Sequence, residues 1–401
     1  MSQSAAQSPH LLRHINRGEL LRFALANGDF TAAEAMSATG LTRATVLGVC
    51  ADLVGARWLE EIADSRAAGL SSRGRPARRY RLRPDAGVVL GIDAGESRFD
   101  AILADLRGQV LAREHRRADP AQLGRDGRVA VVRELVDATL DAANRHPTEL
   151  LITVIGVPAP IDPEGRSPDD DGAFWQVMNA DFQDHLEGLV VIENDANLAA
   201  LAEHASHPGR NVATLLTGER FGAGLIVDGR LLHGSRGGAG ELRFLEVFVR
   251  DDPDAGTEDG LGALARRWAR GELDRTDAPS SLRALGADEI DAEAVFAAAA
   301  AGDALADGIL RRLGSRLAHI VVVLESVLDV DEVVIAGGIA AGIGPVLGHA
   351  RSTLEADFYP PFPELRASRL GREVIARGGI ALALARIRED PLSILPVGVV
   401  A

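Results

Sequence analysis

The sequence contains no lysine, so all 43 of its basic residues are arginine. We attribute this bias to the base composition of the genome rather than to a function. A single cysteine, Cys50, excludes an internal disulfide and any zinc site built from several cysteines. No run of about 18 uncharged apolar residues occurs, so no membrane-spanning segment or membrane partner is expected. Residues 1–20 lack the apolar core of a secretory signal, and we expect a cytoplasmic protein.

The composition that remains is that of a globular protein. The chain has 401 residues, of which 46% are hydrophobic and 25% charged, and this excludes a fibre or a wholly disordered chain. The length predicts two or three domains. The formal net charge is −15, yet residues 1–83 carry 12 arginines against 7 acidic residues. A small basic segment on an acidic remainder indicates that this segment meets a polyanion.

Residues 10–83 show the pattern of a helix-turn-helix domain. Apolar residues recur at helical spacing over 11–25, which predicts a first helix. The capping box Thr31-Ala-Ala-Glu34 opens a second helix, and a turn at Gly40 leads to a third helix over 43–54. Side chains near the start of the third helix are the candidate contacts in a DNA major groove, namely Thr42, Arg43 and Thr45.

Two short segments follow, 58–62 and 79–82, in which apolar and polar residues alternate as in β-strands. They predict a β-hairpin, or wing. The segment between them, 71–78, is rich in arginine and contains Gly and Pro. Such an extended tip is suited to laying arginines into a minor groove. The candidate DNA contacts here are Arg73, Arg75 and Arg78. A helix-turn-helix used only for protein contact, with a solvated basic loop, is the alternative.

The rest of the chain begins with a candidate phosphate loop. Val88 to Asp93 is an apolar strand that ends in Asp93-Ala-Gly95-Glu-Ser97 and returns as a hairpin. Small residues allow a close approach of the backbone, a hydroxyl donates a hydrogen bond, and an aspartate can hold a metal-bound water. This pattern can therefore cradle a phosphate with Asp93, Gly95 and Ser97.

A second polar cluster follows the buried strand 189–192 at Glu193-Asn-Asp-Ala-Asn197. Polar side chains at the carboxyl end of a parallel strand are well placed to meet a ligand. Asp195 is a candidate general base that accepts a proton from a sugar hydroxyl. Alternatively, Asn194 and Asp195 only cap the helix that follows.

Glycine pairs mark two further segments. Gly337-Gly338 follows the predicted strand 333–336, and Gly378-Gly379 is predicted to precede a last helix that ends at Arg388. Such a pair either approaches a nucleotide closely or only permits tight packing of a helix on a strand.

The order strand–strand–strand–helix–strand–helix occurs twice, near 88–205 and 212–350. We therefore predict an α/β body of two lobes around a ligand cleft. Pro84-Asp-Ala-Gly87 is predicted to be a linker. The predicted domains are a winged helix-turn-helix at 1–83, a first α/β lobe at 84–205 with part of the C-terminal helical region, and a second α/β lobe at 206–401.

Together these motifs, over residues 10–388, resemble the ROK family (repressor, open reading frame, kinase). The resemblance rests in the head on 11–16, 39–46 and 74–77, and in the body on 91–95, 193–197, 237–241 and 336–340. It implies an actin-like, sugar-kinase-like body. In the order given, the four body motifs of the family contact phosphate, carry the catalytic base, bind sugar and bind adenosine. The implied nucleotide residues are Asp93, Gly95, Ser97, Thr217, Gly218, Gly337 and Gly338, and the implied ligand residues are Asn194, Asp195 and Glu241.

The sequence departs from the family pattern at two places. The family has Glu-x-Gly-His followed by a cysteine-rich zinc motif, whereas this chain has Glu241-Leu-Arg-Phe244 and no later cysteine. No zinc is therefore expected, and no cofactor unless ATP and magnesium serve a kinase. Arg243 either recognises an acidic sugar or phosphate, or faces solvent or a structural carboxylate. The loop 217–224 is longer than the family's, and Glu219 places a negative charge where ATP phosphates would lie.

We predict a sugar-responsive transcriptional regulator, a repressor, that binds double-stranded operator DNA as a homodimer or homotetramer. Two-fold symmetry then predicts a palindromic site. A ligand between the lobes would change the spacing of the two heads through its different affinity for two states. The alternatives are an ATP-dependent sugar kinase with Asp195 as its base, and a regulator that responds to a protein partner instead of a sugar.

Overall fold

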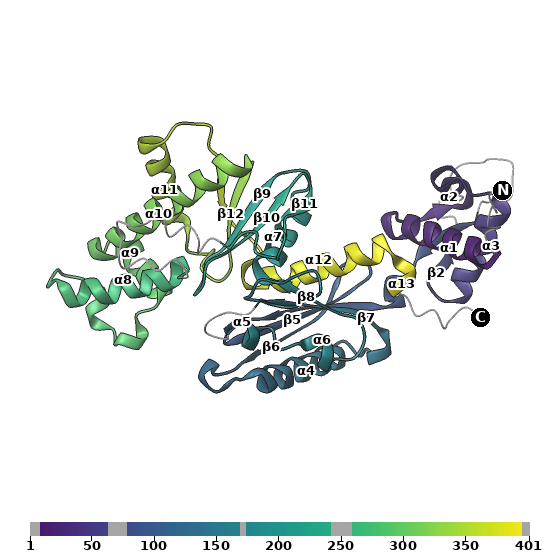
Figure 1. Cartoon of the computed structure of the whole chain (residues 1–401), viewed down its shortest axis with the longest axis horizontal. Coiled ribbons are helices and arrows are strands. Elements are labelled where there is room, and N and C mark those ends of the chain that lie inside the picture. Colours follow the sequence, from purple (N-terminus) through teal and green to yellow (C-terminus); the bar gives the residue numbers. More distant parts are fainter. Residues whose placement is uncertain (1–8, 63–77, 169–173, 242–258, 395–401) are drawn as a thin grey trace.

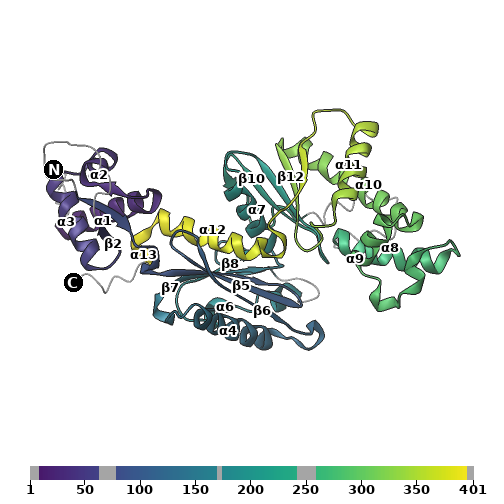
Figure 2. The same ribbon diagram turned by 180° about the vertical axis from the view of Figure 1, so that it is seen from behind.

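The structure is a computed structural model, and it describes residues 9–62, 78–168, 174–241 and 259–394. A small N-terminal unit, here called the head, precedes two α/β lobes that are each built on a five-stranded sheet (Figure 1). Helix α12 (Val374–Glu389) runs from the junction of the lobes toward the head in both views (Figures 1 and 2). In the described ranges, no helix has the length and apolar character needed to span a membrane.

The head consists of three helices and a small antiparallel sheet. Its elements are α1 (Pro9–Ala26), β1 (Phe30–Thr31), α2 (Ala32–Thr39), α3 (Arg43–Gly55), β2 (Leu59–Ile62) and β3 (Arg79–Leu82), with the strands in the order β1-β3-β2. The predicted capping box forms, because the Glu34 amide donates to Thr31 Oγ1 and the Thr31 amide donates to the Glu34 carboxylate. Gly40 ends α2 with a φ of 69°, and Thr42 caps α3. The predicted helices and strands of the head are confirmed.

The first lobe is built on a mixed sheet of order β6-β5-β4-β7-β8. Its strands are β4 (Val88–Ala94), β5 (Arg98–Asp105), β6 (Val110–Arg117), β7 (Leu150–Val157) and β8 (Val190–Asn194), and its helices are α4 (Arg125–Ala142), α5 (Phe174–Met178) and α6 (Phe182–His185). Strands β4, β7 and β8 are parallel. Side chains of β4 alternate between two cores, with Leu90 and Ile92 packed beneath α4 and Val89 packed beneath α12. The strand is therefore buried on both faces.

The second lobe has the sheet order β11-β10-β9-β12-β13. Its strands are β9 (Val212–Leu216), β10 (Gly222–Val227), β11 (Arg230–Leu231), β12 (Glu332–Ala336) and β13 (Glu364–Ala367), and its helices are α8 (Leu261–Arg275), α9 (Ala292–Ala300), α10 (Ala304–Leu328) and α11 (Gly344–Asp357). These helices share one core with the sheet, and α7 (Asp195–Ser206) packs on β9 and β10. The sequence analysis did not predict β13, whose four residues are too few to show an alternating pattern.

The two lobes share one topology. In each lobe three consecutive strands form an antiparallel meander, the fourth strand pairs in parallel with the first, and the fifth pairs in parallel with the fourth. The duplicated α/β architecture is confirmed, while the boundaries 83/84 and 205/206 remain predictions. The predicted motifs lie at the carboxyl ends of these strands, where open α/β sheets bind ligands.

Helices α7 and α12 join the lobes through close backbone contact, since they pack on each other and on opposite sheets. A Cβ on Gly378 would lie 1.9 Å from the carbonyl oxygen of Leu198, and a Cβ on Gly224 would lie 2.1 Å from that of Ala196. The prediction that Gly378-Gly379 precedes the last helix is wrong, because both residues lie inside α12. The pair permits tight packing, the second of the two roles considered.

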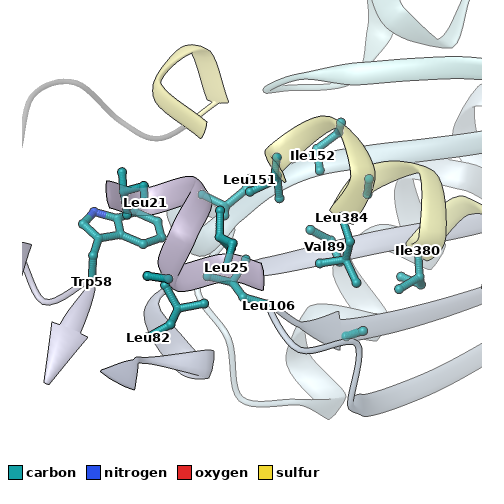
Figure 3. Close-up of a cluster of buried hydrophobic side chains, with 14 of the residues drawn as sticks. Leu21, Leu25, Trp58, Leu82, Val89, Leu106, Leu151, Ile152, Ile380 and Leu384 are labelled. Carbon is teal, nitrogen blue, oxygen red and sulfur yellow. The ribbon is translucent and has the colours of Figure 1, made fainter. Parts of the chain in front are cut away.

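The segment predicted to be a linker does not separate the head from the body. Pro84–Ala86 forms a short 3₁₀ turn, and the Leu106 amide donates to the Pro84 carbonyl oxygen. One apolar cluster runs from the head into the first lobe and α12 (Figure 3), and includes Leu21, Leu25, Trp58, Leu82, Val89, Leu106, Leu151, Ile152, Ile380 and Leu384. Arg107, in the β5–β6 turn, also donates to the carbonyl oxygen of Asn27 at 2.7 Å and to two carbonyls in the last turn of α1. The head is thereby packed against the first lobe.

Candidate functional site

Two adjoining cavities are lined by residues of both lobes. The larger has a volume of about 480 Å³, and the smaller of about 70 Å³. They share the lining residues Pro158, Asp195, Leu216 and Arg220. Of the predicted site residues, the larger cavity is lined by Asp93, Gly95, Ser97, Asp195, Gly218, Gly337 and Gly338, and the smaller by Asn194, Asp195 and Glu241. The structure thus brings together residues that lie far apart in the sequence.

The turn that follows β4 is held by a buried arginine. The guanidinium of Arg128, in α4, donates to the carbonyl oxygens of Ala94 at 2.6 Å and Gly95 at 3.0 Å. The Arg128 side chain is fully buried and lies over the ring of Phe99. Burial lowers the pKa of Arg128 to about 10, so it stays charged at neutral pH. The sequence analysis missed this residue, because an arginine in an amphipathic helix is normally exposed.

Asp93 and Asp195 are carboxyl groups in the larger cavity with shifted pKa values. Burial raises the pKa of Asp195 to about 7, and the charge of Glu241 adds to this effect. The hydrogen bond from the Ala196 amide to Asp195, 2.7 Å long, opposes it. Burial raises the pKa of Asp93 well above its usual range, with the charge of Asp195 as the next cause. A buried carboxyl group with a raised pKa in a cleft is a candidate for proton transfer.

Asn194 is the N-cap of α7. Its side-chain oxygen accepts from the Asn197 amide at 3.1 Å, and its side-chain nitrogen donates to the Ala159 carbonyl oxygen at 3.1 Å. Asn194 therefore caps α7, and it also lines the smaller cavity, so its role as a ligand residue stays a prediction. Asp195 occupies the first position of α7, where a negative charge is favoured by the helix dipole.

A histidine–glutamate pair connects the two lobes beside this cap. His233 Nε2 lies 2.9 Å from Glu193 Oε2, and Glu193 Oε1 accepts from the Asn194 amide and the Asn197 side chain. The hydrogen bond with Glu193 raises the pKa of His233. His233 directly precedes the glycine-rich loop 234–241, so the pair ties that loop to the end of β8. The sequence analysis included Glu193 in the 193–197 motif without giving it a role, and it did not single out His233.

The loop after β9 differs from an open phosphate cradle. The carbonyl oxygens of 217–219 accept hydrogen bonds from amides at the start of α8, namely those of Gly260, Gly262 and Ala263. These amides are the donors that a helix N-terminus would otherwise offer to an anion. Thr217 is buried and lines neither cavity. Glu219 lines the larger cavity, but Arg266 pairs with it at 2.6 Å and compensates the charge that the sequence analysis expected to repel phosphates.

Gly337 and Gly338 follow β12 and line the larger cavity. The φ of Gly337 is 93°, a conformation that favours glycine. The guanidinium of Arg372 lies near Gly338, 3.5 Å from the position of a Cβ there. Across the described ranges, no three histidine, cysteine, aspartate or glutamate residues gather as metal ligands would. The absence of zinc remains a prediction.

The residues predicted to contact DNA differ in their exposure and in the hydrogen bonds and ion pairs that they make within the head. Thr42 and Arg43 are exposed at the start of α3, and Thr45 is partly exposed. Thr42 Oγ1 accepts from the Thr45 amide and lies 2.9 Å from Thr45 Oγ1, so these threonines serve the helix cap. Arg78, at the base of the hairpin, pairs with Glu61 at 3.3 Å. Three predicted residues lie outside the described residues: Arg73, Arg75 and Arg243.

The sequence analysis also missed a contact that crosses the cleft. The guanidinium of Arg220, from the second lobe, lies 3.6 Å from the centre of the Phe174 ring. It also lies 4.0 Å from the carboxylate of Glu96. Both partners belong to the first lobe. The charged insertion in the 217–224 loop was visible in the sequence, but its aromatic partner lies far away along the chain.

This chain is similar in sequence to known repressors and kinases. The sequence model of the ROK family matches residues 89–251. The xylose repressor of Caldicellulosiruptor bescii is 27% identical over 250 residues, which are 60% of this chain and 61% of that protein. The chain thus spans about three fifths of that repressor's length. The glucokinase of Halalkalibacterium halodurans is 25% identical over 319 residues, which are 72% of this chain and 93% of that protein.

Among solved structures, the fold is shared with a ROK family transcriptional regulator described as a homolog of the E. coli MLC protein. The TM-score is 0.73 at 21% identity, and the likeness covers 94% of this chain and 97% of that chain. The sugar-kinase-like α/β fold predicted for the body is confirmed, because a ROK family glucokinase from Streptomyces griseus shares it at a TM-score of 0.60 and 22% identity, over 74% of this chain and 99% of that chain.

Proposed function

Because the chain carries a ROK family domain over residues 89–251, we propose that it is a sugar-responsive DNA-binding transcriptional regulator, a repressor. The observation that carries this proposal is the head, in which α2 and α3 are joined by a turn at Gly40 and followed by the β2–β3 hairpin. This is the element order of a winged helix-turn-helix domain. The shared fold with the ROK family transcriptional regulator supports it, because 94% coverage of this chain extends into the head.

Helix α3 has the two sides that a recognition helix needs. Its buried side consists of Val46, Val49, Cys50 and Leu53, and its exposed start carries Thr42 and Arg43. In helix-turn-helix proteins the first residues of this helix contact base edges, and its amide groups can meet a phosphate. Arg43 is therefore the residue that we expect to contact a base or phosphate. The arginines of the wing would add minor-groove contacts.

Replacing Arg43 with alanine should weaken specific DNA binding by roughly 1–3 kcal/mol if the arginine contacts a base edge. The fold should not change, because the Arg43 side chain is exposed. The operator would first be selected from random duplexes with the purified protein. The affinity of each variant for that operator would then be measured by fluorescence anisotropy at several salt concentrations.

The matched control is Arg369→Ala, which removes an exposed arginine that follows β13 in the second lobe. This variant should bind the operator as the wild type does. Failure to select any sequence would count against a DNA-binding head. Equal affinities of Arg43→Ala and the wild type would count against α3 as the recognition helix.

A route from the cleft to the head runs along α12. Val374 and Ile375, at its start, line the larger cavity and belong to the apolar cluster shared with the head. Ile380 and Leu384, further along α12, belong to the same cluster (Figure 3). A ligand that binds one arrangement of the lobes more tightly would bias the position of α12 and of the head. In a homodimer or homotetramer this would change the spacing of the heads on a palindromic operator.

An ATP-dependent sugar kinase is the second candidate. The observation that favours it is Asp195, a carboxyl group with a pKa of about 7, in a cavity also lined by Gly337 and Gly338. The hydrogen bonds between the start of α8 and the carbonyls of 217–219 argue against it, because they occupy amides that could bind phosphate.

The variant Asp195→Asn separates the two functions. If the chain is a kinase, loss of the base should lower sugar-dependent ADP release by about 10²–10⁴-fold. If the chain is a regulator, the wild type should release no ADP with any sugar, and Asp195→Asn should keep wild-type operator affinity in the absence of ligand. A coupled ADP assay and operator anisotropy on the same preparations would distinguish these results.

A further inference from the structure

We infer that Arg107 and Arg22 are positioning residues that fix the direction in which the head points from the body, and that this fixed direction makes DNA binding selective for the spacing of two half-sites. The inference rests on the proposed function in that it takes the heads of an oligomer to bind DNA. It goes further by naming the contacts that decide which operators two heads can occupy together.

Arg107, in the first lobe, closes the C-terminal end of α1. Its guanidinium donates to the carbonyl oxygens of Asn27 at 2.7 Å, Leu25 at 3.2 Å and Ala24 at 3.4 Å. The last carbonyls of a helix have no partner inside the helix, and they carry a partial negative charge. A cation is therefore stabilised at this end of α1, and its three acceptors define the direction from which it approaches.

The turn that carries Arg107 is itself held in one shape. The carboxylate of Asp105, which is 6% exposed, accepts from the amides of Arg107 at 2.8 Å and Gln109 at 2.9 Å. Gly108 completes the turn with a φ of 79°, and its amide donates to the Asp105 carbonyl oxygen at 2.9 Å. Because the turn is fixed on β5 and β6, Arg107 transmits the orientation of the first sheet to α1.

Arg22, in α1, makes the reverse contact with the body. Its Nε donates to the carbonyl oxygen of Glu389, the last residue of α12, at 3.1 Å. The short helix α13 (Pro391–Ile394) then packs on α1, where a Cβ on Gly18 would lie 3.2 Å from Leu392 Cδ1. The C-terminal ends of α1 and α12 thus each accept a hydrogen bond from an arginine of the other unit.

These contacts differ in kind from the apolar cluster that joins the head to the body. The apolar cluster holds the two units together (Figure 3), but apolar attraction has no preferred direction. Hydrogen bonds weaken steeply when their angles depart from linearity. The cluster therefore supplies adhesion, and the arginine contacts set the angle. Helices α2 and α3 share a core with α1, so they turn with it.

A fixed angle of the head has a direct consequence for DNA binding. In a two-fold symmetric oligomer, both heads can engage one face of the duplex only when the half-sites lie whole helical turns apart, about 10–10.5 base pairs each. When geometry forbids the second contact, the gain from binding with two heads is lost. Rigidly held heads therefore restrict the spacing of the operator, whereas heads that can turn would accept several spacings.

The first test measures operator affinity against half-site spacing, by fluorescence anisotropy on the operator selected as above. Inserting two base pairs between the half-sites rotates one of them by about 70°. Wild-type affinity should fall about 10²-fold, because the second head no longer meets its half-site. For Arg107→Ala the fall should be less than about tenfold, with Arg22→Ala acting in the same direction. Affinity for an isolated half-site should be unchanged in both variants, which a general loss of structure would not allow.

The second test needs no DNA and measures the distance between the head and the first lobe by pulsed electron paramagnetic resonance. The chain's single cysteine, Cys50, is buried and would be replaced by alanine. Spin labels would be placed by Ser37→Cys in α2 and Asp137→Cys in α4, both at exposed positions. Labelled chains would be diluted with unlabelled protein. We expect a narrow distance distribution for the parent protein and a broader one when Arg107→Ala is added.

The matched control is Arg83→Ala. Arg83 lies where the head meets the body, but its guanidinium donates to Asp85, two residues along the same segment, at 2.7 and 3.1 Å. This variant removes an arginine from the junction without breaking a contact of α1. It should keep both the spacing requirement and the narrow distance distribution. Thermal unfolding would verify that each variant is folded.

Three results would overturn the inference: a wild-type protein that tolerates every spacing, an unchanged spacing requirement in Arg107→Ala, or an equally narrow distance distribution in that variant. The two tests also keep the proposed function separate. An operator that is bound with the same spacing requirement by Arg107→Ala would refute only the inference. A protein that selects no operator, yet shows the expected broadening of the distances, would refute the DNA-binding role and retain the two arginines as the contacts that fix the head.

Discussion

Replacing Arg366 with methionine is expected to lower the free energy of unfolding by about 3–5 kcal/mol. Arg366, in β13, lies between Glu203 at the end of α7 and Glu332 in β12, and both carboxylates are only 2% exposed. Its guanidinium donates to Glu203 at 2.8 Å and also to Glu332. Methionine fills much of the same volume but leaves two buried carboxylates without a cation. The midpoint of thermal unfolding should fall by several degrees.

Arg210 provides the matched control for this experiment. Arg210 pairs with Glu364 at 2.9 Å, and Glu364 lies in β13 near Arg366. The side chains of Arg210 and Glu364 are 48% and 58% exposed. An exposed ion pair contributes about 0–1 kcal/mol, so Arg210→Ala should unfold close to the wild-type midpoint. A wild-type midpoint for Arg366→Met would show that the buried network does not hold α7 against the second sheet.

Replacing Gly378 with alanine is expected to destabilise the protein by about 3 kcal/mol or more, although it adds only one methyl group. The new Cβ would lie 1.9 Å from the carbonyl oxygen of Leu198 and 2.4 Å from its carbonyl carbon. These atoms belong to the backbone of α7, so the clash is relieved only if α7 and α12 move apart. Helix propensity alone would favour alanine by about 1 kcal/mol. The packing against α7 therefore decides that the substitution lowers the free energy of unfolding. Chemical or thermal unfolding of the variant measures the loss.

The control is Gly308→Ala in α10. Gly308 is exposed in the helix interior and no atom lies within 4 Å of the position of its Cβ. This substitution should stabilise the protein by about 0.5–1 kcal/mol, through the entropy of the unfolded chain and helix propensity. The same chemical change is thus expected to have opposite signs at the two positions. If Gly378→Ala were also stabilising, the close contact between α7 and α12 would be refuted.

Both experiments probe the connection between the lobes on which the proposed regulation depends. Arg366 holds α7 to the second sheet, and Gly378 sets the distance between α7 and α12. Helix α12 in turn reaches the apolar cluster shared with the head (Figure 3). A folded Gly378→Ala variant should therefore also respond differently to a ligand, measured as the ligand-induced change in operator affinity.

Local interactions explain why the sequence predicted the head so closely. The capping box of Thr31 and Glu34 joins residues three apart, and the cap of Thr42 on α3 is equally local. Such contacts depend on neighbours in the sequence and are therefore visible in it. The same holds for apolar strands such as β4 and β7, whose composition shows burial on both faces. Where local pattern was absent, as in β13, no element was predicted.

The chain's own sequence therefore determined the helices of the head, the duplicated strand order of the body and the residues at the carboxyl ends of its strands. The tertiary structure alone decided what surrounds those residues. Three contacts join segments that are distant in the sequence: Arg128 with the turn after β4, Arg266 with Glu219, and Arg220 with Phe174. Their geometry depends on how the sheets and helices pack, and packing is a property of the whole fold rather than of any local window. The charge and the size of the cleft follow from these contacts.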